Sequence, residues 1–129
     1  MRKIEKILTL ADNALNTAYN NKRIVAEDGS VDKVYNAYIA SFPACVIQSG
    51  LVPALAFYCG EGAAEGDRKL IIEAIANMLQ AKYPEFTNAQ TLFRYCVENQ
   101  VSNEQKEDII NAAIALKLMI RTYKLKDKK

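Results

Sequence analysis

The side chains best suited to covalent chemistry in this 129-residue chain are three cysteines, Cys45, Cys59 and Cys96. A thiol acts as a nucleophile once a neighbouring base, most often histidine, has taken its proton. The chain contains no histidine, so the usual general base near neutral pH and the commonest metal ligand are both missing. The cysteines are odd in number, widely spaced and without a Cys-x-x-Cys pair. They therefore predict buried, reduced thiols in a cytoplasmic protein.

The acidic residues predict a structural role rather than a catalytic one. Glu104, Glu107 and Asp108 fall in the first turns of a predicted helix, where negative charge favours the helix dipole. The glycine-rich stretch GEGAAEG at residues 60–66 lacks the preceding strand and the Lys-Ser/Thr pair of a phosphate-binding loop, so it predicts a flexible loop. We therefore expect no catalytic residue, no metal and no cofactor.

The clearest charge pattern is basic and lies at the C-terminal end. Residues 117–129 hold six bases and one acid, although the net charge of the chain is only +2. Lys117, Arg121 and Lys124 are spaced four and three apart, which predicts one shared helix face. Such a face suits contacts with phosphate groups. The structural alternative is a solvated surface whose end, at residues 117–129, is partly frayed. Because no base-reading module is recognisable, nucleic-acid binding would rely on backbone and shape.

Helices are predicted to position these residues, because apolar side chains recur at spacings of three and four and no segment alternates with period two. Ser30 is expected to cap the second helix. Two capping boxes are expected later, at Thr87 with Gln90 and at Ser102 with Gln105. The prediction is a single all-α domain over residues 1–129, a compact bundle of about six or seven helices. The predicted helices cover residues 3–19, 31–42, 44–48, 51–58, 67–82, 89–98 and 103–125.

The segment from Val34 to Gly60 carries no formal charge, in a chain of which 25% is charged. A membrane span needs about 20 predominantly apolar residues in a row. Polar residues, Pro43 and Pro53 interrupt this run, and their backbone groups would lack partners in hydrocarbon. We therefore expect no membrane association. The segment instead predicts a helical hairpin at the heart of the core, bent at Pro43 and ended by a left-handed cap at Gly50.

Part of this neutral segment resembles a known family. It contains Phe42-Pro43, then Val46-Ile47-Gln48-Ser49-Gly50-Leu51, then Ala54-Leu55-Ala56-Phe57. This order is similar to that of the small all-helical fifth subunit of the type III-B CRISPR effector, the Cmr complex. Members read Leu-Pro, a short apolar helix ending Gln-Asn-Gly-Leu, and an Ala-Leu-Ala-Phe helix. Ser49 replaces the usual Asn, and residues 39–42 lack the basic residues that often precede the Leu-Pro. The match is dense over residues 35–58 and looser elsewhere.

The resemblance implies a non-catalytic, cytoplasmic subunit. Copies of such subunits stack head to tail as a minor filament, beside the major filament that grips the guide RNA. The implied partners are neighbouring copies, the backbone subunit, the other Cmr subunits and the guide RNA–target RNA duplex, with no small-molecule substrate. The candidate RNA-binding residues are Lys117, Arg121, Lys124, Lys22, Arg23 and Lys33. The candidate structural residues are Pro43, Gln48, Gly50, Leu51 and Phe57. Replacing Gly50 or Phe57 is expected to unfold the protein.

Two other functions remain open. A helical protein–protein adaptor without RNA contact would not depend on the basic residues, so their replacement by alanine would leave RNA protection unchanged. A small enzyme using Cys45, Cys59 or Cys96 would need a reactive thiol, which rapid labelling of the native protein would reveal.

Overall fold

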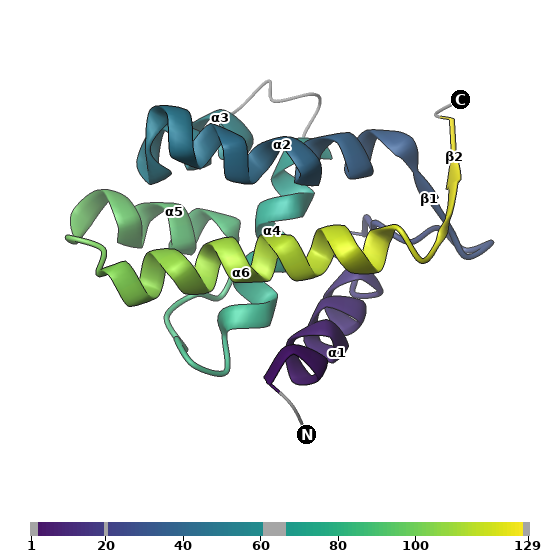
Figure 1. The fold of residues 1–129 in the computed structure, drawn as a ribbon, viewed down its shortest axis with the longest axis horizontal. Helices are drawn as coiled ribbons and strands as arrows, with labels where there is room; N and C mark the ends of the chain where they lie inside the picture. Colours follow the sequence, from purple (N-terminus) through teal and green to yellow (C-terminus); the bar gives the residue numbers. More distant parts are fainter. Residues whose placement is uncertain (1–2, 20, 61–66, 128–129) are drawn as a thin grey trace.

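A computed structural model describes residues 3–19, 21–60 and 67–127 as one helical body with a short two-stranded sheet (Figure 1). The all-α class is confirmed, with six helices in the described part of the chain. The glycine-rich loop predicted at 60–66 lies, apart from Gly60, outside the described residues. The elements in chain order are α1 (Lys3–Leu15), β1 (Ser30–Asp32), α2 (Lys33–Ser49), α3 (Leu51–Cys59), α4 (Asp67–Leu79), α5 (Ala89–Glu98), α6 (Asn103–Ile120) and β2 (Lys124–Lys126).

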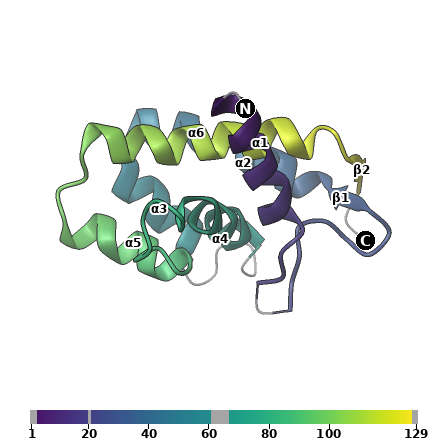
Figure 2. The same ribbon diagram turned by 90° about the horizontal axis from the view of Figure 1, so that it is seen from below.

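Helix α4 lies at the centre of the fold. It contacts α1, α2, α3, α5 and α6, and it crosses behind α2 and α6 (Figure 1). Its residues from Leu70 to Ala76 are all buried, so the helix is enclosed on every side. In Figure 2, α2 and α6 form one layer, and α3, α4 and α5 form the other. We expected residues 34–60 at the heart of the core, but the structure places α4 there and the neutral segment beside it.

The neutral segment does form the predicted helical hairpin. Helices α2 and α3 pack on each other, with Ile39, Phe42 and Val46 buried on α2. Gly50 joins the two helices with φ +95° and ψ 163°, and its N–H donates to the carbonyl of Val46. The positive φ explains why glycine is needed there. The ψ value places Gly50 in a region that essentially only glycine adopts, rather than in the left-handed helical cap that we expected.

Pro43 does not break α2, contrary to the expected bend that divided the segment into separate helices. The helix runs without interruption through Pro43 from Lys33 to Ser49. Proline lacks an N–H and crowds the carbonyl four residues earlier, here that of Ile39, which disfavours a helix interior. Ile39, Phe42 and Val46 nevertheless continue one buried face across the proline. Tertiary packing of this face therefore outweighs the local preference.

The helix starts confirm one predicted cap and correct two. The Ser102–Gln105 capping box is present at α6. Ser30 lies in β1, and the N-cap of α2 is Asp32, whose carboxylate accepts from the N–H of Val34 at 2.9 Å. The capping box of α5 is formed by Asn88 with Thr91, one residue after the predicted pair of Thr87 and Gln90. Asn and Asp are both strong N-caps, so neighbouring polar residues compete for the role.

Three helices end before their predicted limits. Helix α4 ends at Leu79 rather than Lys82, and α6 ends at Ile120 rather than Leu125. Helix α1 ends at Leu15 instead of Tyr19, where the side chains of Asn16 and Thr17 donate to the carbonyls of Asp12 and Asn13. Such side-chain bonds to the last carbonyls compete with further helical turns.

Glu73, near the middle of α4, is a buried carboxylate that anchors α5. Its side chain is only 8% exposed. Its Oε1 accepts a hydrogen bond of 2.6 Å from the N–H of Ala89, the first residue of α5. The N-terminus of a helix carries partial positive charge and unsatisfied N–H groups, so it is a suitable partner for an acid. Burial, and after it the charge of Glu73, raises the pKa of the nearby Tyr19 phenol.

Candidate nucleic-acid interface

Five exposed or half-buried bases lie where α2 begins and α6 ends, at the end of the molecule that holds the two strands (Figure 1). Four of them, all except Lys126, are called the basic corner here: Lys33, Lys117, Arg121 and Lys124. Lys33 is the first residue of α2, and Lys117 lies in the last turn of α6. Arg121 is the C-cap of α6, and Lys124 begins β2. The negative end of the helix dipole favours cations in that last turn of α6.

The parallel pairing of β1 with β2 builds this corner. Val31 pairs with Leu125 in register, and Ser30 pairs with Lys124. Val31 is fully buried and Leu125 is half-buried, whereas Lys124 and Lys126 are exposed. Because side chains alternate along a strand, the two lysines point to solvent on the side opposite Leu125. The strand thus fixes Lys124 at the surface beside the end of α6.

Two ion pairs hold the strands together at their ends. The ammonium of Lys126 binds the carboxylate of Asp28, which also accepts from the N–H and hydroxyl of Ser30. Lys33 Nζ lies 3.2 Å from Asp127 Oδ1. The hydrogen bond from Lys126, followed by those from Ser30, holds the pKa of Asp28 far below its usual range. Asp28 therefore stays ionised across the physiological pH range, and Lys126 and Lys33 are each matched by an acid.

Hydrogen bonds of Tyr123 connect the basic corner to α1. The hydroxyl of Tyr123 donates to the carboxylate of Asp12, and the Asn16 amide donates to the same hydroxyl at 3.0 Å. Burial, and then the bond to Asp12, raises the pKa of the Tyr123 phenol, which remains a donor at neutral pH. Tyr123 thus connects the segment after α6 to α1.

The structure unites four of the six candidate RNA-binding residues and separates the other two. Lys117 and Arg121 share one side of α6, but Lys124 lies on β2 and not on the predicted common helix face. Lys22 and Arg23 are exposed in the loop between α1 and β1. In Figure 2 this loop reaches away from α6 to the opposite edge of the molecule. Lys117, Arg121 and Lys124 form no ion pair with any residue that the structure describes.

The candidate structural residues divide between core and surface. Leu51 is buried, Pro43 and Gly50 are half-buried, and Gln48 is exposed. Phe57 was expected in the core, but it is 55% exposed. The Arg68 guanidinium lies over its ring, 4.0 Å from the centroid. The apolar spacing of α3 could not distinguish Phe57 from its buried neighbour Tyr58, because the whole helix is uncharged.

The cysteines are free and differ in burial. Cys59 and Cys96 are buried, and Cys45 is half-buried. Burial raises the pKa of the Cys59 thiol to about 12 and that of Cys96 to about 11. No cluster of three or more metal-ligating side chains occurs among the residues described. Within the same residues, no helix is long and apolar enough to span a membrane.

We expect thiol labelling of the native protein to resolve two classes of cysteine. Because burial raises the pKa of the Cys59 thiol to about 12, very little of it is ionised at pH 8, and the thiolate is the reactive form. Cys45 should react in a fast phase with an aromatic disulfide reagent, whereas Cys59 and Cys96 should react fully only after denaturation. Release of the coloured thiolate, followed by absorbance, measures both phases. Rapid reaction of Cys59 or Cys96 would contradict their burial. The enzyme hypothesis would be favoured by that result, or by a Cys45 that reacts faster than the same thiol in the denatured chain.

Comparison with models of known protein families gives a match. Residues 10–121 match the model of a family described as CRISPR-associated protein (Cas_Cmr5), which covers most of the 129-residue chain. Neither the curated proteins nor the solved structures gave a match. The matched region includes the last six residues of α1, the whole of α2 to α5, and α6 with its C-cap.

Proposed function

Because the chain belongs to the Cas_Cmr5 family of CRISPR-associated proteins, the small subunits of type III-B Cmr complexes, we propose that it is a non-catalytic structural subunit that touches RNA. Its partners are other subunits of the Cmr complex. In this proposal, copies stack in the minor filament beside the backbone subunit. The basic corner then faces the channel that holds the guide RNA–target RNA duplex.

The observation that carries the RNA contact is the chemistry of the basic corner. Arg121 and Lys124 are exposed, and neither is paired with an acid in the part of the chain that the structure describes. A cation that is not already neutralised can replace counterions along a phosphate backbone. Lys33 would have to exchange Asp127 for a phosphate, so it is a weaker candidate. Lys22 and Arg23 remain candidates on a separate surface.

We expect the double variant R121A/K124A to weaken RNA binding by the assembled complex several-fold at physiological salt. The slope of log affinity against log salt is negative, and its magnitude should decrease by about 2 for each bound copy, because each lost phosphate contact removes about 0.9. The measurement is a salt titration of target-RNA binding by complexes reconstituted with guide RNA. The matched control is R94A/K106A, which removes two exposed bases from α5 and from the start of α6.

The same experiment separates the two parts of the proposal. If the wild-type chain fails to co-purify with the co-expressed Cmr subunits and guide RNA, the subunit assignment itself is wrong. If it assembles but both double variants bind RNA like the wild type, the basic corner does not contact RNA.

That second outcome would favour a helical adaptor without RNA contact. One observation supports this alternative: α2 and α6 pack side by side and expose large apolar side chains, Ile47 on α2 and Ile114 and Leu118 on α6. Ile47 is 80% exposed. Contact with another protein would cover these side chains, which are otherwise left in water.

A further inference from the structure

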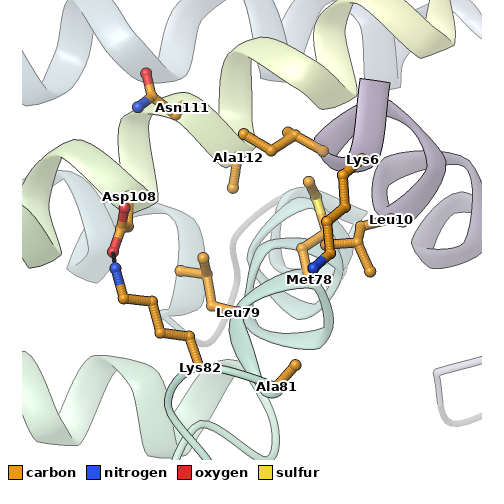
Figure 3. Close-up of a pocket in the computed structure, with 10 residues that line it drawn as sticks. Lys6, Leu10, Met78, Leu79, Ala81, Lys82, Asp108, Asn111 and Ala112 are labelled. Carbon is orange, nitrogen blue, oxygen red and sulfur yellow. Dashed lines mark hydrogen bonds and ion pairs between the residues drawn. The ribbon is translucent and has the colours of Figure 1, made fainter. Parts of the chain in front are cut away.

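A recess lies among α1, the C-terminal end of α4 and the middle of α6, away from the basic corner. Its volume is about 310 Å³. The walls include Ile7 and Leu10 of α1 and Leu79 of α4, all of which are half-buried, and the floor includes Met78 and Ala112. Figure 3 shows Leu10, Met78, Leu79 and Ala112 around one hollow. Three large aliphatic side chains are therefore left in partial contact with water, although they belong to three packed helices.

Charged side chains lie on two opposite sides of the rim of this recess, and those on one side are paired with each other. On one side, Lys82 Nζ lies 2.9 Å from Asp108 Oδ2 and 3.4 Å from Glu104 Oε1. Asp108 also accepts from the hydroxyl of Tyr83 at 2.6 Å. These contacts raise the pKa of Lys82, and they fix the side chains that form this edge. Lys82 is thus already neutralised by acids of its own chain.

Lys6 stands across the recess from that pair (Figure 3). Its side chain is exposed, and it forms no ion pair with a residue that the structure describes. Among the residues that the structure describes, the recess consequently offers an apolar hollow with a cation at its edge, Lys6, that no acid neutralises. An occupant that matches both features must combine an apolar group with a carboxylate.

We propose that this recess docks an extended segment of a neighbouring polypeptide in the assembled complex. The segment places one large apolar side chain, of the size of Leu or Phe, in the hollow, and a nearby Asp or Glu pairs with Lys6. A volume of about 310 Å³ lies at the lower end of sites that enclose a small molecule, and it has room for an anchoring apolar side chain. This inference rests on the proposed function, because the neighbouring chain is a subunit of the same complex.

The test is photo-crosslinking within the reconstituted complex. The photoreactive amino acid p-benzoylphenylalanine is incorporated at Asn111, an exposed residue of the rim. After irradiation, the crosslinked peptide is identified by mass spectrometry. We expect a crosslink to one polypeptide segment that contains a large apolar residue within two positions of Asp or Glu.

Two exposed neighbours in the turn after α4 provide a matched pair of variants. Ala81 lines the recess and Gln80 does not. The indole of A81W should cover the opening and abolish the crosslink, whereas Q80W should leave its yield unchanged. Replacing Lys6 by alanine should lower the yield by a factor of about two to five, because a solvated ion pair contributes little. Circular dichroism verifies that each variant is folded.

The outcomes distinguish this inference from the proposed function. Failure of the chain to enter the complex would remove the proposed function and, with it, the basis of this inference. Assembly without a crosslink at residue 111 would overturn the inference alone. So would a crosslink to RNA or to a segment without an apolar residue, or equal yields from A81W and Q80W.

Discussion

Replacement of Phe42 by alanine is expected to lower the free energy of unfolding by about 3–5 kcal/mol. Phe42 is completely buried, and its ring packs edge-on against that of Tyr58 with centroids 5.2 Å apart. Tyr58 in turn donates to the carbonyl of Tyr38 at 2.6 Å. The substitution removes the aromatic contact and leaves a cavity between α2 and α3. A domain of this size has about 5–15 kcal/mol of stability in total, so much of it should be lost.

Urea denaturation followed by far-ultraviolet circular dichroism measures this change, and Phe57 supplies the matched control. Phe57 belongs to the same hairpin, but most of its effect on stability should come from the stacked Arg68 guanidinium. Replacing Phe57 by alanine should therefore cost only about 0.5–1 kcal/mol. Similar losses from the two variants would show that α3 is rotated relative to the structure described.

Replacement of Glu73 by alanine is the second large effect and should cost about 2–3 kcal/mol. The substitution removes the acceptor of the Ala89 N–H, a donor at the buried start of α5. It also removes a negative charge from the N-terminus of that helix. Thermal and urea unfolding both report the loss. Hydrogen exchange of the amides of α5 should locate the opening there.

Two controls separate the hydrogen bond of Glu73 from its charge. Glu73→Gln keeps a carbonyl oxygen as acceptor, so its cost should be about 1 kcal/mol or less. Glu107→Ala removes an exposed acid from α6 and should change stability by less than about 0.5 kcal/mol. If Glu73→Ala proved as mild as Glu107→Ala, the carboxylate would not anchor α5.

The helices could be predicted, because the spacing of apolar residues is a local property of the sequence. The arrangement of the helices could not be predicted in this way. The neutral segment was expected at the centre because it lacks charge. A lack of charge does not imply burial, since Ala37, Ala40 and Ala44 are uncharged and exposed on α2. Helix α4 reaches the centre although it contains Glu73, because one hydrogen bond to α5 satisfies that acid. Such a partner lies in another part of the chain, so the spacing within α4 cannot reveal it.

The sequence predicted the basic residues of the candidate interface, but not how the fold arranges them. The lysines and Arg121 near the C-terminus are evident in the sequence, and four of the six candidate residues lie together. Strands of three residues give no usable alternation, so neither β1 nor β2 could be recognised. Their pairing is instead set by distant partners, including Asp28 for Lys126 and Asp12 for Tyr123. The surface position of Phe57 was unpredictable for the same reason, since it depends on how α3 packs.

The parallel strand pair also has a consequence for the order of folding. Lys126 and Asp28 lie 98 residues apart in the chain. Contacts between such distant residues close a long loop, and they form after local helices because the entropy of loop closure must first be overcome. The basic corner is therefore expected to be among the last surfaces to form, after the helical body has docked. A newly made chain would present this surface only once residues 124–127 have joined the fold.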